Sequence, residues 1–296
     1  LAVLELREGE PVVDLRKHIT EVNKWLLYPF VLDDQATFLF ADGGSGKSLI
    51  ALAILLTIQE NTLALVGRLP NWSARGLYLD WESTAQEHSE RYRHLLTGAG
   101  IDPSAISLLY RRCDSPLVEQ VSQLQRYIAT EGIGFVVIDS VVAACSGEAE
   151  HSDTARQFFG ALRRLRVPSL CISHTTKQND TSHKPFGSVH FNNLARNTWE
   201  MHCQHDEGQD IMHLALYNRK INAGKRHKPI GYKIAFSEDA IRITTADVMD
   251  VPEFAVVAPL QSRINSILIL PMTEEAIAEE LTAQGDKETR VESIRR

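Results

Sequence analysis

The stretch "ATFLFADGGSGKSLIALAI", residues 36–54, decides the fold, because it joins a short apolar strand to an apolar helix through a glycine-rich turn. It nearly spells the phosphate-binding pattern G-x-x-x-x-G-K-[ST], with Ala41 in place of the first glycine. That position closes the strand, where a small residue with an ordinary backbone suffices. The residues that we expect to bind a nucleotide are Gly43, Gly44, Ser45, Gly46, Lys47, Ser48 and Leu49.

The chemistry of this turn follows from its residue types. The glycines let backbone N–H groups face an anion at the N-terminus of a helix. Lys47 then reaches the β- and γ-phosphates, and the hydroxyl of Ser48 is a ligand for Mg²⁺. The competing interpretation is a turn with a chance Gly-Lys-Ser, which is disfavoured because the turn lies between a strand and a helix. We therefore expect ATP and Mg²⁺ as cofactors.

Strands and helices alternate along the first two thirds of the chain. Apolar runs recur at residues 36–41, 76–81, 107–112, 134–140 and 169–174. Segments with an apolar spacing near 3.6 residues lie between them, at 47–60, 84–96, 117–130 and 153–165. This alternation predicts an α/β fold with a mostly parallel sheet covered on both faces. After about residue 197 strands alternate with turns instead, which predicts an antiparallel extension of the sheet.

Two acidic residues end predicted strands. Asp139 ends "GFVVID", where it is predicted to hold Mg²⁺ through water; the alternative is an aspartate that caps the next turn. Glu82 ends "LYLDWE" and is predicted to orient and polarise the attacking water. Asp80, two residues earlier on the same face, is the competing candidate. Glu82 is preferred because a general base should project beyond the carboxyl edge of the sheet, where ligands bind in such folds.

The segments "ADGGSGKS", "LYLDWES", "FVVIDS", "ISHTTK" and "FGSVHFNNLAR", in this order, resemble the RecA-like ATPases of the hexameric replicative helicase group, RepA type. The resemblance covers roughly residues 25–237 and implies a RecA-like P-loop NTPase core. It implies that Lys47 and Ser48 belong to Walker A, that Asp139 is the Walker B aspartate, and that Glu82 is the catalytic glutamate.

The same resemblance gives His174 a role. It matches the residue that senses the γ-phosphate and relays its state to the loops that contact DNA. Ala41 departs from the usual glycine, and Ser173 stands where the group often carries a first histidine. Neither departure removes an irreplaceable charge. From the residues alone, a histidine that merely closes a strand is the alternative.

Ring ATPases of this group complete each site with a cation from the neighbouring subunit, which stabilises charge in the transition state. The resemblance therefore implies a homo-oligomer, with a hexameric ring expected. The stretch "LYNRKINAGKRHKPIGYKIAF" resembles the segment that carries such a cation. Lys220 is the first choice and Arg219 the second. The alternative is a solvated basic turn, as charge runs commonly are.

Two polar loops follow the expected carboxyl edge, at residues 144–154 and 177–196. By resemblance they face the ring channel and contact single-stranded DNA. Lys177, Lys184 and Arg196 are predicted to follow the phosphates without reading sequence. Loops this long are either functional or disordered, and the sequence leaves both open.

Composition adds limits on location and partners. The net charge of -7 argues against a broadly cationic surface for nucleic acid, but leaves room for a basic groove. Four widely spaced cysteines indicate a reduced protein, and we expect it in the cytoplasm. No apolar run approaches the roughly 20 residues that cross a bilayer, so no membrane partner is expected.

The chain is expected to divide into three parts. Residues 1–245 form the ATPase domain with an N-terminal extension, residues 246–260 a linker, and residues 261–296 a helix-turn-helix-like module that the chain end truncates. Thr273 is the expected N-cap of its second helix. The end resembles the first helices of a winged helix, with Thr289, Arg290, Ser293 and Arg296 on a recognition helix. A small helical module for oligomerisation or docking is the alternative.

These features favour an ATP-driven, ring-forming DNA helicase or translocase of the replicative type, moving on single-stranded DNA. The alternative is a RecA-like ATPase that switches a DNA-bound or regulatory assembly without unwinding. A small-molecule kinase shares the phosphate loop, but the chain lacks an evident acceptor-binding lid, and Glu82 at the second strand argues against it.

Overall fold

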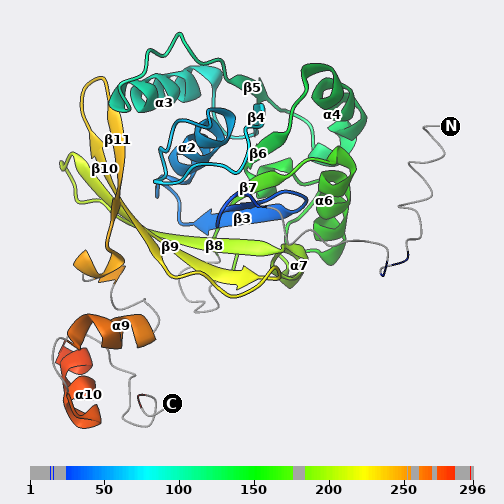
Figure 1. Cartoon of the computed structure of the whole chain (residues 1–296). Helices are drawn as coiled ribbons and strands as arrows, with labels where there is room; N and C mark the ends of the chain where they lie inside the picture. Colours follow the sequence, from blue (N-terminus) through cyan, green and yellow to red (C-terminus); the bar gives the residue numbers. More distant parts are fainter. Residues whose placement is uncertain are drawn as a thin grey trace.

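A twisted sheet forms the centre of the molecule (Figure 1). The computed structural model describes residues 14, 16, 25–175, 184–251, 253–254, 260–268, 272–283 and 294. Within this part of the chain the sheet has nine strands in the order β11-β10-β9-β8-β3-β7-β6-β4-β5. They are β3 (Ala36–Ala41), β4 (Gly76–Asp80), β5 (Leu109–Arg112), β6 (Phe135–Asp139), β7 (Ser169–His174), β8 (Asn197–Gln204), β9 (Ile211–Ile221), β10 (Ile230–Phe236) and β11 (Ile241–Ala246). A separate hairpin, β1 (Trp25–Leu27) and β2 (Val31–Leu32), precedes them.

Helices cover both faces of this sheet (Figure 1). The helices that precede β8 are α2 (Lys47–Gln59), α3 (Ala85–Gly98), α4 (Leu117–Glu131), α5 (Val141–Ala144), α6 (Ser152–Leu165) and α7 (Val189–Leu194). Helices α2 and α3 bury their apolar side chains in one hydrophobic cluster, and α4 and α6 in another. Phe38 and Leu39 of β3 belong to different clusters, because successive side chains of a strand point to opposite faces. The predicted two-faced α/β sheet is confirmed.

The pairing of the strands brings the ends of four of them to one edge. Strands β3, β7, β6, β4 and β5 pair in parallel, whereas β9, β10 and β11 pair antiparallel, as the sequence predicts. Strand β8, where the sequence predicts that the antiparallel extension begins, pairs in parallel with β3 and antiparallel with β9. The register places Ala41 beside His174 and Asp80 beside Asp139. We call this side, where β3, β4, β6 and β7 end, the carboxyl edge, and the opposite side the amino edge.

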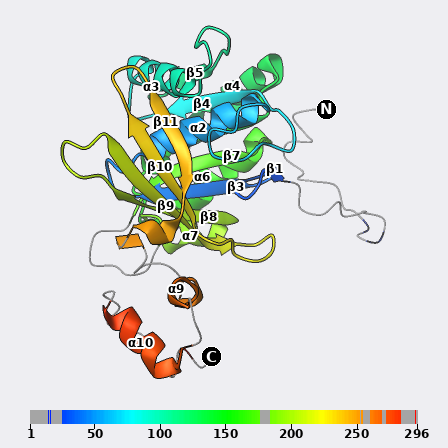
Figure 2. The same cartoon turned by 60° about the vertical axis from the view of Figure 1, so that its left-hand side comes forward.

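The antiparallel strands carry the sheet to helix α3 (Figure 2). The end of α3 lies against β11, where a Cβ added to Gly98 would be 2.0 Å from the carbonyl oxygen of Ile241. The Arg242 guanidinium also donates to the Gly98 carbonyl, at 3.2 Å. Helix α3 therefore connects the end of β4 to the far end of the sheet.

The segment predicted as a linker packs in part on the sheet. A short 3₁₀ helix, η1 (Val248–Asp250), follows β11, and Val248, Val251 and Phe254 form a small hydrophobic cluster with β9. The hydroxyl of Tyr217 donates to the Phe254 carbonyl at 2.8 Å. The division of the chain into three parts stays a prediction.

Two C-terminal helices, α9 (Leu260–Ile267) and α10 (Glu274–Ala283), are set away from the sheet (Figure 2). The hydroxyl of Thr273 accepts from the backbone N–H of Ala276 at 3.2 Å, so the predicted N-cap is confirmed. The predicted recognition helix, with Thr289, Arg290, Ser293 and Arg296, lies outside the described residues. Among the described residues, no helix is long and apolar enough to cross a membrane.

Candidate functional site

The glycine-rich turn has the backbone geometry of an anion cradle. Gly44 and Gly46 have φ values of 71° and 85°, in the left-handed region that side chains disfavour. Gly43 is outside that region, so it does not share this constraint. Gly46 directly precedes α2, whose first backbone N–H groups point out of the helix N-terminus. The turn thus presents donors where a phosphate would bind.

Lys47 is folded back onto the turn, and this explains why Ala41 is tolerated. The Lys47 ammonium donates to the carbonyl oxygens of Ala41, at 3.1 Å, and Asp42, at 2.5 Å. The backbone N–H of Thr175 donates to the same Ala41 carbonyl at 3.2 Å. Position 41 therefore acts through its backbone, which alanine supplies as well as glycine. Burial lowers the pKa of Lys47, although nearby carboxylates oppose this effect.

Ser48 and Asp139 lie together at the start of α2 and the end of β6. The Ser48 hydroxyl donates to Asp139 Oδ2 at 2.6 Å, and the Tyr78 hydroxyl donates to the same oxygen at 2.7 Å. Burial raises the pKa of Asp139, while these two hydrogen bonds oppose the rise. A hydroxyl and a carboxylate beside a phosphate cradle are the hard oxygen ligands that Mg²⁺ prefers. The two residues therefore fit the predicted metal.

Glu82 projects from the end of β4 into solvent, with 43% of its side chain exposed. Its carboxylate accepts from the Ser140 hydroxyl and lies 3.9 Å from His174 Nε2. The interaction with His174 lowers the pKa of Glu82; burial opposes the shift and the Ser140 contact adds to it. Glu82 is thus held ionised and within reach of water, as its predicted role requires.

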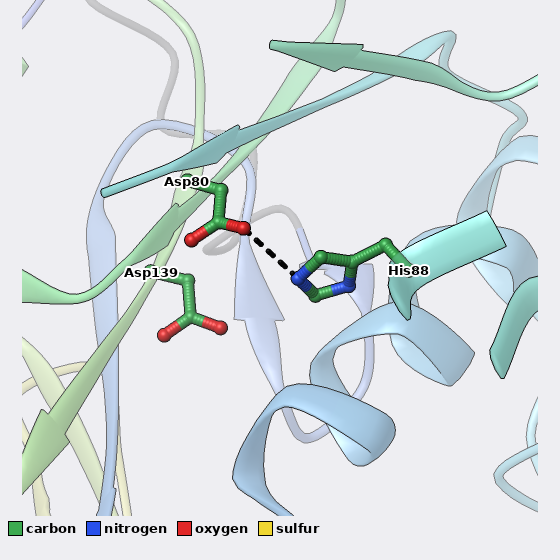
Figure 3. Close-up of side chains that lie close together, drawn as sticks. All are labelled: Asp80, His88 and Asp139. Atoms are coloured by element: carbon green, nitrogen blue, oxygen red, sulfur yellow. Dashed lines mark ion pairs between the residues drawn. The ribbon is translucent and has the colours of Figure 1, made fainter. Parts of the chain in front are cut away.

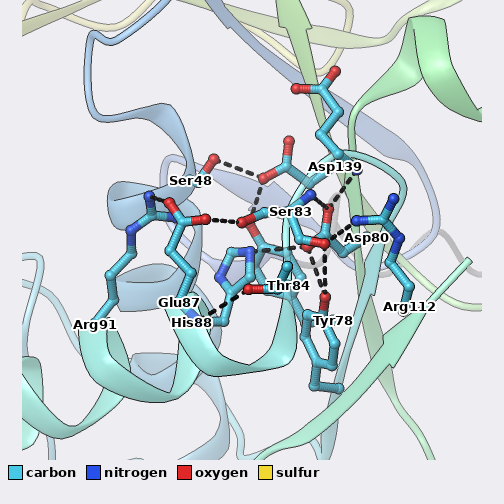
Figure 4. A network of polar contacts seen from close by, with 12 residues as sticks. Ser48, Tyr78, Asp80, Ser83, Thr84, Glu87, His88, Arg91, Arg112 and Asp139 are labelled. Carbon is cyan, nitrogen blue, oxygen red and sulfur yellow. Dashed lines mark hydrogen bonds and ion pairs between the residues drawn. The ribbon is translucent and has the colours of Figure 1, made fainter.

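The side chain of Asp80, unlike that of Glu82, is fully buried. Its Oδ1 accepts from the backbone N–H groups of Glu82 and Ser83 at 2.8 and 3.0 Å. Its Oδ2 lies 3.1 Å from His88 Nε2 (Figures 3 and 4). The same oxygen accepts from the Tyr110 hydroxyl at 2.8 Å. Burial alone would raise the pKa of Asp80, but these partners together lower it to about 2.

The trio Asp80, His88 and Asp139 has its ligand atoms within 4.8 Å of one another (Figure 3). Both oxygens of Asp80 already accept from the partners just described, and Asp139 accepts from two hydroxyls. We interpret the trio as an internal brace behind the site. Through Asp80 Oδ1 it holds the backbone of Glu82 in place from the buried side.

A cavity of about 380 Å³ lies at the carboxyl edge. It is lined by most of the residues that the sequence singled out: Gly44, Ser45, Gly46, Lys47, Ser48, Leu49, Glu82, Asp139 and His174. Sequence reasoning missed five further lining residues: Arg91, Ile172, Met212, Phe236 and Ile241. They come from α3, β7, β9, β10 and β11, and no local motif marks them. Only the strand pairing, which brings the antiparallel strands beside the phosphate loop, could have indicated them.

Comparison with known proteins agrees with this geometry. Residues 4–180, more than half of the chain, match the model of a family described as an AAA domain. The chain belongs to this AAA domain family. A KaiC-like protein from the hyperthermophilic archaeon Pyrococcus horikoshii OT3 has a similar fold, with a TM-score of 0.50 at 13% sequence identity. The similarity covers 74% of this chain and 93% of that chain. No curated protein matches the sequence.

The fold of this AAA domain is an α/β RecA-like core, and the chain is a P-loop ATPase of the RecA-like type. At 13% identity the structural likeness concerns the fold alone. The remaining predicted residues bear on activity on DNA, on assembly and on the RepA type.

Lys220 and Arg219, the predicted trans cations, lie at the amino edge of the sheet. Strand β8 runs parallel to β3, and β9 pairs Lys220 with Thr198 near the start of β8. The Lys220 ammonium donates to the carbonyls of Asn192, Asn193 and Ala195 at 2.7–2.8 Å and so caps the end of α7. Burial and then the charge of Arg196 lower the pKa of Lys220. Arg219 pairs with the buried Glu200. Neither cation reaches the phosphate loop of its own subunit.

The two predicted DNA-binding residues that the structure describes, Lys184 and Arg196, lie at different edges of the sheet. Lys184 is exposed beside the bridge between Thr175 and Pro185, near the carboxyl edge. Arg196 is exposed where β8 begins, at the amino edge, because α7 carries the chain back along the sheet. Lys177 lies outside the described residues. Their contact with DNA stays a prediction.

Proposed function

We propose that this AAA domain protein is an ATP-hydrolysing, ring-forming DNA helicase or translocase of the replicative RepA type, acting on single-stranded DNA in the cytoplasm. The nucleotide cavity, with a phosphate cradle, a carboxylate pair and a histidine at one edge, supports the hydrolytic part. The four free cysteines support a reducing location.

In the proposed reaction the phosphate loop and Lys47 bind and orient the triphosphate. Glu82, held by Ser140 and His174, positions a water molecule and takes up its proton as the water attacks the γ-phosphate. Mg²⁺, held through Ser48 and Asp139, would neutralise charge on the β- and γ-oxygens. Burial lowers the pKa of Lys47, and the three nearby carboxylates, Asp139, Glu82 and Asp42, oppose that shift by favouring the ammonium form.

One observation supports a link between hydrolysis and movement on DNA. The backbone N–H of Phe186 donates to the carbonyl of His174 at 2.7 Å, so the loop with Lys184 is hydrogen-bonded directly to the residue beside Glu82. The N–H of Ser188 in turn donates to the carbonyl of Ala149 in the other predicted DNA loop at 2.8 Å. A shift of His174 on loss of the γ-phosphate would therefore displace both loops.

The ring is proposed from the position of Lys220. Its ammonium lies at the opposite edge from its own phosphate loop, where a neighbouring subunit's carboxyl edge can meet it. Subunits packed head to tail, with one edge of each copy facing the other edge of the next, form a closed ring when the rotation between neighbours closes. Lys220, with Arg219 as the second choice, would then complete the neighbour's site.

The test is strand displacement on a forked DNA duplex with ATP and Mg²⁺, alongside ATP hydrolysis with and without single-stranded DNA. We expect hydrolysis stimulated by DNA and displacement of one strand, both lost in Lys47→Ala. Stimulated hydrolysis without displacement would favour the switch. Hydrolysis indifferent to DNA would reject a DNA motor of either kind.

A further inference from the structure

One wall of the cavity is apolar. Met212, Phe236 and Ile241 line it, and they come from three successive strands, β9, β10 and β11. These strands step away from β3 in that order across the sheet. We call these three residues the apolar shelf. The base of a nucleotide whose triphosphate lies on the glycine-rich turn is within reach of this shelf, because the turn and the shelf line the same cavity.

The shelf begins directly at the phosphate loop. The sulfur of Met212 lies 3.4 Å from the point where a Cβ on Gly46 would be, so the loop and the shelf are in contact. Met212 and Ile241 are each 7% exposed, and the Phe236 ring is half-buried and stacks with the His205 ring at 5.8 Å. An aromatic ring, a thioether and a branched side chain suit the flat face of a base.

The apolar shelf offers the edge of a base few unused hydrogen-bond donors among the described residues. The backbone N–H of Phe236 already donates to the Asp210 carbonyl at 2.8 Å, and that of Ser237 to the Ala240 carbonyl at 2.9 Å. Among the described lining residues, carboxylates occur only at Glu82 and Asp139, on the phosphate side. The charge of Arg91, the polar lining residue that α3 contributes, is paired with Glu87.

Adenine and guanine differ at their edges, where one presents a donor and the other an acceptor at the same position, but both present a π face. A site that holds a base by its face therefore discriminates weakly, whereas a site built to hydrogen-bond the edge discriminates strongly. We propose that the substrates of this site are purine nucleoside triphosphates as a class, with GTP bound and hydrolysed as well as ATP. This inference rests on the proposed hydrolysis of a nucleotide in the cavity, and not on the action on DNA.

The first experiment measures binding of fluorescent ATP and GTP analogues to the full chain, and then kcat/KM for ATP and GTP. We expect both nucleotides to bind, with kcat/KM values within about 100-fold of each other. A larger preference for ATP overturns the inference and leaves an ATPase standing. Failure to bind any triphosphate overturns both the inference and the proposed function.

The second experiment separates the shelf from the phosphate loop. Phe236→Ala should weaken ATP and GTP equally, by about tenfold, because both lose the same stacking surface. Competition by inorganic tripolyphosphate should stay unchanged, since it has no base. Phe236→Leu should restore part of the loss. Ile211→Ala, next to Met212 but on the other sheet face and 38% exposed, is the matched control and should bind like the parent chain.

Two outcomes of the second experiment would contradict the inference. Weakening of tripolyphosphate by the same factor would mean that Phe236→Ala disturbs the loop, and the shelf would not be the base site. Weakening of ATP alone would mean that the edge of adenine is read, which also contradicts the inference.

Discussion

Asp80 and Glu82 are carboxylates two residues apart, and their surroundings give them different roles. Asp80 is buried, ionised and saturated with donors, whereas Glu82 is 43% exposed and borders the cavity. Because the backbone N–H of Glu82 donates to Asp80, the buried carboxylate fixes the backbone from which the exposed one projects. Asp80 therefore supports the site, whereas Glu82 carries out its chemistry. A different variant tests each of the two roles.

The role of Glu82 is tested by Glu82→Gln. We expect nucleotide binding to persist while hydrolysis slows by about 10²–10⁴-fold, because the amide keeps the shape but does not accept the proton of the attacking water. Single-turnover hydrolysis and nucleotide binding measure the two effects. Glu90→Gln, at an exposed position of α3, is the control and should hydrolyse normally. Full activity in Glu82→Gln would exclude the residue as the base.

Asp80→Asn tests whether the buried charge of Asp80 stabilises the fold, through the pH dependence of the free energy of unfolding. The pKa of Asp80 is about 2 in the folded chain against 3.8 ordinarily, so the folded state prefers the ionised form by about 2 kcal/mol. This stabilisation is fully present above pH 4 and is lost as the pH falls toward 2. We expect urea unfolding to show a gap between parent and variant that is constant above pH 5 and shrinks below about pH 4. A gap that does not depend on pH would contradict a role for the charge.

At the residue scale, the sequence predicted the groups that local pattern marks. Gly44, Lys47, Ser48 and Asp139 follow from motif and strand order, and the structure places them around one cavity. The role of Asp80 could not be read in this way, because its partners His88 and Tyr110 come from α3 and β5. A local pattern does not tell which of two neighbouring acids turns inward.

At the element scale, the packing of α3 against β11 sets the distance between the two walls of the cavity. Helix α3 carries Arg91 on one wall and ends against Ile241 on the other. The alternation of strands and helices predicted both elements, but not that they touch, because the contact joins residues about 140 positions apart. Gly98 allows it: no side chain fits between the helix end and the β11 backbone.

Gly98→Ala is therefore expected to lower the free energy of unfolding by about 1–3 kcal/mol, because its methyl group would lie 2.0 Å from the Ile241 carbonyl oxygen. Gly160→Ala is the matched control, in helix α6, where an added Cβ meets nothing within 4 Å. That variant should be about 0.5–1 kcal/mol more stable. Urea unfolding of both measures the difference, and equal effects would contradict the close approach.

At the scale of the whole molecule, the two edges of the sheet carry complementary halves of one reaction site. The carboxyl edge holds the phosphate loop and Glu82, while Lys220 lies at the amino edge. Within one subunit Lys220 has a structural task, since it caps α7 with three hydrogen bonds. A loss of activity on its removal is therefore ambiguous by itself, and the trans role needs a test in which both halves come from different chains.

Mixed rings supply that test. Alone, Lys220→Ala should lower turnover by about 10³-fold with nucleotide binding nearly intact, and Lys47→Ala should be inactive. In a 1:1 mixture of the two, random assembly makes about one interface in four complete, with an intact phosphate loop facing an intact Lys220. We expect ATP turnover to reappear in co-purified rings carrying two different tags. The control mixes Lys220→Ala with the double variant Lys47→Ala, Lys220→Ala, which offers no intact Lys220 and should stay inactive. No recovery in the first mixture would mean that Lys220 acts only on α7 of its own subunit, and the ring would need another cation.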